Sequence, residues 1–304
     1  MVLSNKQGEL PTLQVPITQL KYYQMKFTLG TLLAIPAAAL FMTACNNGSS
    51  TTSATKDSTK TPTVQVTNVT IDAGGVPLNS VVAFNDDTTT RKPVIVIVPE
   101  WWGLDTHVKN VAQRLAELGY FAIGLDMYGN SKLADNPDTA KAWATPFYAN
   151  PRLANERILA AIAKAKTYSV VDTANIAAIG YCFGGSCVLN AARLGTPLKA
   201  VASLHGGLAT SLPISKDLFK AAVLICHGAA DKFVSPEEVA TFKKQMDSAG
   251  VKYVFKEYAN ATHAFTNPAA TATGKKFNMP IEYNAAADTA SWNDMKAFLG
   301  AELR

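Results

Sequence analysis

Cysteine and histidine are sparse in this sequence, and its basic residues form no cluster. Its 304 residues include four cysteines and four histidines, and no pair of cysteines has the spacing of zinc ligands. Charged residues make up 17% of the chain, the net charge is only +5, and no basic run or basic stretch interleaved with aromatic residues occurs. These absences exclude a zinc module and give no support to nucleic-acid binding. We therefore expect no metal, no cofactor and no nucleic-acid partner.

Long apolar runs are also lacking, with one partial exception near the start. The run from Phe27 to Met42 is too short and too rich in alanine to predict a membrane span. It follows Met25-Lys26 and precedes Thr43-Ala44-Cys45, and a positive start, a short apolar core and small residues predict a secretory signal. The segment ending in Cys45 resembles a bacterial lipobox, in which this cysteine is lipidated and becomes the mature N-terminus. The alternative is an ordinary signal peptide with an unrelated cysteine.

These features divide the chain into four segments. Residues 1–24 fit no structural pattern, so we expect translation to begin at Met25. Residues 25–44 form the predicted signal, and residues 45–62, rich in Ser, Thr, Asn and Lys, form a predicted flexible tether. Residues 63–304 have the length and composition of one large α/β domain. We expect an exported, periplasmic or outer-membrane-anchored protein whose membrane contact runs only through the lipid.

Apolar periodicity predicts a parallel sheet covered on both faces. From Pro93 onward, strand and helix patterns alternate, and the strands at 94–98 and 222–225 are apolar at every position. An antiparallel hairpin is predicted around 72–75. This layout predicts an α/β-hydrolase fold with a mostly parallel sheet of about eight strands and helices on both faces. The predicted strands are 64–71, 78–84, 93–98, 121–126, 175–180, 199–204, 221–226 and 251–257, and the predicted helices are 106–118, 134–146, 151–168, 184–193, 236–249 and 282–299.

A cysteine lies in the tight turn that follows one of these strands. Gly180-Tyr181-Cys182-Phe183-Gly184 has the G-x-S-x-G pattern of a nucleophile elbow, with sulfur in place of the hydroxyl oxygen. The flanking glycines are needed because side chains there would clash as strand passes into helix. We predict that Cys182 is a nucleophile, and the alternative is a small buried apolar residue.

An acid and a histidine follow two later strands. Asp231 and His263 come after the strands at 221–226 and 251–257, so the chain order is nucleophile, acid, histidine, as in α/β-hydrolases. An imidazole can take the proton of the thiol, and a carboxylate behind it fixes its tautomer. Asp231 could instead cap the following helix. Three other histidines compete with His263: His107 on a surface or pocket rim, His205 as a pocket residue, and His227 as a structural residue.

The remaining cysteines carry a weaker prediction. Cys187 falls on the helix after the elbow and Cys226 at the end of a strand. We expect both to be small buried apolar residues. A disulfide between them is the alternative, because export would permit one.

Several motifs together resemble the dienelactone hydrolase family over about residues 64–300. They are Pro99-Glu100-Trp101-Trp102-Gly103-Leu104, Asp126-Met127-Tyr128-Gly129, Gly180-Tyr181-Cys182-Phe183-Gly184-Gly185, His227-Gly228-x-x-Asp231 and His263-Ala264-Phe265. The resemblance implies a catalytic triad of Cys182, Asp231 and His263. It also implies that Glu100 interacts with the resting cysteine and is displaced when substrate binds, although a loop glutamate of no special role is the alternative.

The same loops supply oxyanion donors and pocket residues. By position, the backbone N–H groups of Trp101 and Phe183 are the predicted oxyanion donors. An apolar pocket is predicted from aromatic residues near these loops, although such residues are as often plain core. The candidate pocket residues are Trp102, Tyr128, His205 and Phe265, with Phe147 nearby in the pattern.

One position departs from the family pattern. Members that cleave dienelactone hold the substrate carboxylate with arginines, one of them four residues after the histidine, where this chain has Asn267. Arg152 or Arg157 could substitute, but arginines on helices are more often solvated. A substrate other than the carboxylate-bearing dienelactone is therefore expected.

The sequence thus predicts a hydrolase of esters or lactones, similar to carboxymethylenebutenolidase, that works through a thioester on Cys182. The alternatives are a non-catalytic surface-binding lipoprotein on a hydrolase scaffold, and an acyltransferase or thiol peptidase. The sequence leaves the natural substrate and the oligomeric state open.

Overall fold

The computed structural model describes residues 62–304. The predicted segments 1–24 and 25–44, the lipid site at Cys45 and nearly all of the tether lie outside the described residues. All the described residues belong to one compact unit. None of its helices combines the length and the apolar character needed to span a bilayer.

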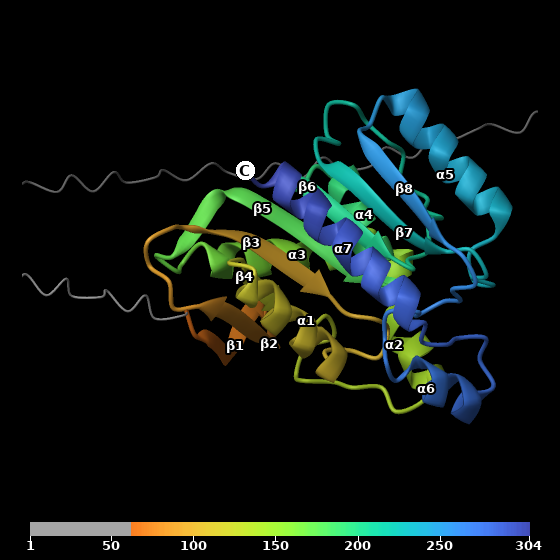
Figure 1. The fold of residues 1–304 in the computed structure, drawn as a ribbon, viewed down its shortest axis with the longest axis horizontal. Helices are drawn as coiled ribbons and strands as arrows, with labels where there is room; N and C mark the ends of the chain where they lie inside the picture. The colour runs from red at the N-terminus through yellow and green to blue at the C-terminus, as the bar shows by residue number, and fades with distance from the viewer. Residues whose placement is uncertain (1–61) are drawn as a thin grey trace, which may run out of the picture. The chain divides into compact units, whose positions relative to one another are not determined.

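Eight strands form one sheet in the order β1-β2-β4-β3-β5-β6-β7-β8 (Figure 1). The pairs β1–β2 and β2–β4 are antiparallel, and every other pair is parallel. The predicted α/β-hydrolase-like fold is therefore confirmed, including the antiparallel hairpin at the edge, where Ala73 pairs with Val76. The strands are β1 (Val64–Ala73), β2 (Val76–Asn85), β3 (Lys92–Val98), β4 (Phe121–Gly124), β5 (Val171–Tyr181), β6 (Ala200–Leu204), β7 (Ala222–Gly228) and β8 (Tyr253–Tyr258).

Helices cover both faces of this sheet. The cluster on one face includes side chains from α1 and α7, and the cluster on the other includes side chains from α2, α3, α4 and α5. Strand β3 is buried on both faces, because Val94, Val96 and Val98 enter one cluster while Ile95 and Ile97 enter the other. This burial explains why residues 94–98 are all apolar. The helices are α1 (Thr106–Glu117), α2 (Pro137–Ala149), α3 (Pro151–Ala165), α4 (Phe183–Arg193), α5 (Pro236–Ala249), α6 (Ala270–Phe277) and α7 (Ala285–Glu302).

Capping residues explain where the predicted boundaries were wrong. Helix α2 begins at Pro137 rather than at 134, because the Asn136 side chain accepts a hydrogen bond from the Thr139 amide and ends the preceding loop. Helix α7 begins at Ala285 rather than at 282, with Asn284 capping in the same way. Helix α6 was not predicted, because this short segment has no sustained apolar period.

Candidate active site

The cysteine elbow joins β5 to α4 with a single residue between them. Cys182 has φ +51° and ψ −116°, a region that non-glycine residues occupy at a cost of about 1–3 kcal/mol. A Cβ atom at Gly180 would overlap the Gly184 carbonyl, and one at Gly184 would overlap the Val98 carbonyl. The two glycines therefore let strand, helix and the end of β3 approach closely enough to hold the turn. This close approach is the physical basis of the elbow motif.

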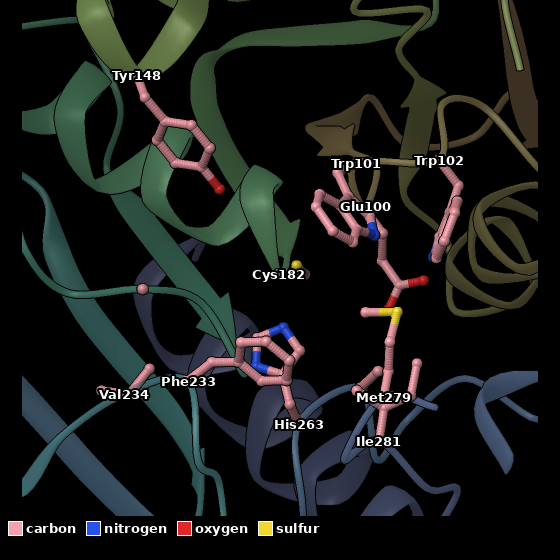
Figure 2. A pocket seen from close by; sticks show the side chains of 12 residues that line it. Glu100, Trp101, Trp102, Tyr148, Cys182, Phe233, Val234, His263, Met279 and Ile281 are labelled. Carbon is pink, nitrogen blue, oxygen red and sulfur yellow. The ribbon is translucent and has the colours of Figure 1, made fainter. Parts of the chain in front are cut away.

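The backbone around Cys182 is fully engaged. Its carbonyl accepts a hydrogen bond from the Gly185 amide at 2.9 Å, and its own N–H is shared between the Leu204 carbonyl at 3.0 Å and His205 Nδ1 at 3.1 Å. The Cys182 side chain is half-buried and faces a cavity, as Figure 2 shows. The sulfur is thus presented to a ligand by a backbone that neighbouring strands hold in place.

Asp231 and His263 meet across the ends of β7 and β8. His263 Nδ1 lies 2.8 Å from Asp231 Oδ2, and the other oxygen, Oδ1, accepts a hydrogen bond from the Phe233 amide at 2.8 Å. The loops that carry these two residues approach closely because Gly228 lacks a side chain. A Cβ atom at Gly228 would lie only 2.5 Å from the Ala261 carbonyl oxygen. Helix α5 is capped by Ser235 rather than by Asp231, so the alternative role considered for that acid is wrong.

The environment of His263 favours its charged form. Burial alone would lower its pKa, but the charge of Cys182 and hydrogen bonds with Asp231 and Cys182 outweigh burial and raise the pKa well above the ordinary value. The ring therefore has a carboxylate on one side and the thiol on the other. This arrangement lets His263 accept and hold a proton from Cys182.

Glu100 is buried at the end of β3, beside the same cavity. Its Oε2 accepts a hydrogen bond from Asn267 Nδ2 at 2.7 Å, whereas Oε1 has no partner within residues 62–304. Burial and the nearby Asp105 carboxylate raise its pKa to about 7, against the opposing effects of Asn267 and His263. Asn267 Oδ1 accepts from the Ala269 amide at 3.0 Å, which fixes the orientation of the amide group. Glu100 is thus held by a neutral donor.

The predicted oxyanion donors lie at the start of α4 and in the loop after β3. Within residues 62–304, the backbone N–H groups of Trp101 and Phe183 donate no hydrogen bond to another group of the chain. The loop that carries Trp101 is fixed by a hydrogen bond from the Tyr128 hydroxyl to the Trp101 carbonyl at 2.8 Å and by one from the Gly103 amide to the Glu100 carbonyl at 3.2 Å. Trp101 lines the cavity, whereas Phe183 is buried and is not among the lining residues, so the role of both amides as oxyanion donors stays a prediction.

The cavity beside Cys182 has a volume of about 240 Å³. Of the predicted pocket residues, Trp102 lines it and Tyr128, His205 and Phe265 do not. Tyr128 and Phe265 are buried, with Phe265 packed against the rings of His205 and Tyr258. The lining residues are Glu100, Trp101, Trp102, Tyr148, Cys182, Gly207, Phe233, Val234, His263, Ala264, Met279 and Ile281.

Sequence patterns did not identify most of the cavity wall. Tyr148 comes from the end of α2, and Phe233 and Val234 follow Asp231 in a loop. Met279 and Ile281 lie between α6 and α7, and a parallel bridge between His263 and Ile281 brings this segment to the site. The one available signal was the pair of large apolar residues Phe233 and Val234, which follow Asp231 and Lys232. Figure 2 shows these side chains surrounding Cys182 and His263.

The competing histidines and arginines lie elsewhere. His107 is half-buried and does not line the cavity; its ring packs edge-on against Tyr181, and burial lowers its pKa to about 4. His227 is buried with its ring against Phe255. Arg157 is also buried, and it donates to the Ala73 carbonyl at 2.6 Å.

The two other cysteines of the described residues lie outside the cavity lining. Cys187 and Cys226 are buried and free, so the disulfide considered between them is not formed. Within the part of the chain that the structure describes, no group of three or more His, Cys, Asp or Glu side chains could hold a metal ion. The functional groups at this site are the thiol of Cys182, the imidazole of His263 and the carboxylates of Asp231 and Glu100.

Comparison with known proteins identifies one family and several relatives. The Dienelactone hydrolase family matches residues 78–303. A Caenorhabditis elegans protein, named uncharacterized protein K02A2.1, is 32% identical over 145 residues, which cover 47% of this chain and 90% of the relative. A Methylorubrum extorquens protein provisionally named carboxymethylenebutenolidase is 29% identical over 185 residues, covering 57% of this chain and 63% of the relative.

Solved structures give a similar result. A dienelactone hydrolase-like promiscuous phosphotriesterase from metagenomic libraries is 29% identical and superposes with a TM-score of 0.74. The match covers 79% of this chain and 99% of that chain. The segment matched by the family includes the three strand ends that carry Cys182, Asp231 and His263.

Proposed function

This chain belongs to the dienelactone hydrolase family and is a hydrolase, and from that premise we propose that it cleaves carboxylic esters or lactones with Cys182 as its nucleophile. One observation carries the proposal. Cys182, His263 and Asp231 reach the same end of the sheet from three different strands, with the histidine bonded to the acid at 2.8 Å and the thiol beside it in a cavity. Such an arrangement is expected of a nucleophile, a base and a residue that orients the base.

The proposed reaction proceeds in two halves. His263 takes the proton of the Cys182 thiol while Asp231 holds the opposite ring nitrogen, and the thiolate attacks the carbonyl carbon. The N–H groups of Trp101 and Phe183 stabilise the oxyanion, and each such donor typically contributes about 3–4 kcal/mol to the transition state. The carbon–oxygen bond then breaks, the leaving alkoxide receives the proton from His263, and the acyl group remains on sulfur as a thioester.

Water completes the cycle. His263 removes a proton from water as the water oxygen attacks the thioester carbon, and the carbon–sulfur bond breaks. The acid leaves, and the proton returns from His263 to the sulfur of Cys182. No group outside the chain is consumed apart from substrate and water.

The test compares wild-type protein with Cys182→Ala on a panel of aryl esters and lactones. We expect the variant to lose at least about 10³-fold in kcat, the scale seen when a nucleophile is removed. Mass spectrometry of the wild-type protein quenched during turnover should show the acyl group on the Cys182 peptide. Unchanged turnover by the variant would refute the assignment, and products formed mainly with added amines or thiols would indicate an acyltransferase instead.

A phosphotriester is a second candidate substrate. A solved relative 29% identical to this chain is described as a promiscuous phosphotriesterase. Such triesters are neutral, and their phosphoryl oxygen could occupy the position proposed for the carbonyl oxygen. Turnover of an aryl dialkyl phosphate that disappears in Cys182→Ala would support this candidate, whereas ester turnover without it would restrict the protein to carbon esters.

A further inference from the structure

The wall of the cavity contains no positive charge to receive an anion. Within the described residues, no lysine or arginine is among those that line it. Its titratable members are Glu100, Tyr148, Cys182 and His263. When His263 is protonated, Asp231 and the Cys182 thiolate already balance its positive charge, so it is not free to pair with a substrate carboxylate. A substrate carboxylate in the cavity would therefore lose its hydration without gaining a counter-ion.

Glu100 makes the wall still less favourable to anions. It lines the same cavity as Cys182, and its side chain accepts a hydrogen bond from Asn267. The Asn267 amide is held on its other side by the Ala269 N–H, so it is not free to turn toward a substrate. A second carboxylate placed nearby would face Glu100 with no cation between the two.

Large apolar groups surround the remaining space. Trp101 and Trp102 pack edge to face with ring centroids 5.3 Å apart, and Met279 and Ile281 line the same cavity. Tyr148 and Phe233 line the cavity although 52% and 49% of their surfaces are exposed, so apolar surface extends from the cavity to its mouth. Such exposed aromatic residues are typical of binding sites for apolar groups.

We infer that this cavity accepts neutral, apolar esters or lactones and rejects substrates that carry a free carboxylate next to the scissile bond. This inference rests on the proposed function and narrows it to one substrate class. The discrimination against the anion should reach about 100-fold in kcat/KM, the scale of leaving a buried charge unpaired.

Three esters with one leaving group test the inference. They are 4-nitrophenyl butyrate, the mono-4-nitrophenyl ester of succinate, and the methyl ester of that monoester, which restores neutrality at similar size. We expect kcat/KM to fall about 100-fold for the anionic ester alone, after subtraction of the rate with Cys182→Ala. Met279→Lys should reduce the discrimination, whereas Met279→Gln, polar but neutral, should not.

The possible results distinguish failure of the inferred substrate class from failure of the proposed hydrolase function. Equal kcat/KM for the neutral and anionic esters, with turnover still dependent on Cys182, would overturn the inference and leave the proposed function intact. If none of the esters is hydrolysed, the proposed function fails, and the inference is then tested by binding. N-phenylbutyramide should protect Cys182 from iodoacetamide better than succinanilic acid, and equal protection would overturn it.

A second inference concerns His205, which was predicted to line the pocket and is instead buried behind the elbow. Its Nδ1 lies 3.1 Å from the Cys182 amide nitrogen, and its Nε2 lies 2.8 Å from Thr266 Oγ1. The backbone at His205 has φ +43°, an uncommon conformation for a residue with a side chain. This conformation places the imidazole between the elbow and the loop that carries His263.

The hydrogen bonds define the tautomer of His205. The Cys182 N–H can only donate, so Nδ1 must accept and the ring proton must lie on Nε2, where it points to Thr266. Burial, and then the charges of His263 and His107, lower the pKa of His205 well below its ordinary value. A neutral ring therefore connects the nucleophile to the loop of the base, with ring centroids of His205 and His263 only 5.4 Å apart.

We propose that His205 and Thr266 are positioning residues that fix the orientation of the Cys182 turn relative to His263. Neither touches the proposed substrate position, because both are buried and neither lines the cavity. Loss of the Thr266 hydroxyl would leave the Nε2–H without its acceptor and would free the ring to shift. Because the Cys182 N–H shares its proton with this ring, the elbow would shift as well.

Thr266→Val, which keeps the shape and removes the hydroxyl, tests this proposal against Thr266→Ser, which keeps the hydroxyl. We expect kcat to fall about 10-fold in the valine variant with little change in KM, and to recover in the serine variant. The pH at which iodoacetamide labelling of the Cys182 peptide reaches half its maximum should rise in the valine variant only, because Cys182 would be less well aligned with His263. Equal losses in both variants, or a wild-type labelling profile in Thr266→Val, would overturn the proposal; if Thr266→Val does not fold, Thr266→Ala is measured in its place.

Discussion

Glu100 gives the sharpest test of the electrostatics at this site, through the stability of the folded protein. It is buried, has one hydrogen bond to Asn267 and no cationic partner within the described residues, and its pKa rises from the ordinary 4.5 to about 7. The folded protein therefore binds a proton on Glu100 that the unfolded chain releases between these two pH values. Stability from this group is fully present below pH 4.5 and is lost as the pH rises through 7.

The magnitude follows from the two pKa values. Each pKa unit corresponds to about 1.4 kcal/mol, so ionised Glu100 costs the folded protein about 3 kcal/mol at pH 8 and above. Glu100→Gln removes that charge and keeps an oxygen that can accept from Asn267. We expect the variant to match wild type at pH 4.5 and to be more stable by about 3 kcal/mol at pH 8, raising Tm by about 6–12 °C for a domain of this size.

Urea and thermal unfolding of both proteins at pH 4.5, 6, 7 and 8 would measure this difference. Glu257→Gln is the matched control, because Glu257 forms an exposed ion pair with Lys243 at 3.1 Å and such pairs contribute only about 0–1 kcal/mol. A difference between Glu100→Gln and wild type that stays constant with pH, or a variant less stable than wild type at pH 8, would refute the reasoning.

Three further predictions concern the acid, the elbow and the N-terminal segment. Asp231→Asn should lower kcat by about 10³–10⁴-fold with little change in KM, because an amide would favour the wrong tautomer of His263; a steady-state kcat near wild type would contradict this role. Gly184→Ala should destabilise the protein by more than about 2 kcal/mol in urea unfolding, since its Cβ would overlap the Val98 carbonyl. Gly300→Ala, a helical position with nothing within 4 Å, should instead stabilise it by about 1 kcal/mol. We also propose that Cys45 is lipidated, so radiolabelled palmitate should enter the full chain and not Cys45→Ser; absence of label from both would point to an ordinary signal peptide, and equal labelling of both would place the lipid on another residue.

The fold, and the placement of the three proposed catalytic residues at one end of the sheet, could be predicted from sequence because each depends on local chemistry. Continuous apolar runs predict buried parallel strands, and the glycines around Cys182 predict a turn that no other residue would tolerate. Asp231 and His263 could be placed because parallel strands end at the same edge of a sheet. Each of these inferences needs only a short stretch of chain.

The residues of the cavity wall could not be predicted from sequence, because the wall depends on contacts between distant segments. The bridge between His263 and Ile281 brings Met279 to the site, and nothing in the sequence around Met279 indicates that contact. His205 illustrates the opposite error. A polar residue at a strand end suggests a pocket, but its positive φ turns the ring inward, where Cys182 and Thr266 satisfy both nitrogens.

The separate origins of the reacting residues and the cavity wall have a consequence for how this protein can change. The proposed nucleophile, acid and base follow strand ends, and the glycines on either side of Cys182 leave no room for a side chain. Tyr148, Phe233 and Met279 come from a helix end and two loops; Tyr148 and Phe233 are exposed, and Met279 is half-buried. Substrate preference can therefore drift by single substitutions in these segments while the reaction itself is preserved, so relatives with the same elbow can act on very different molecules.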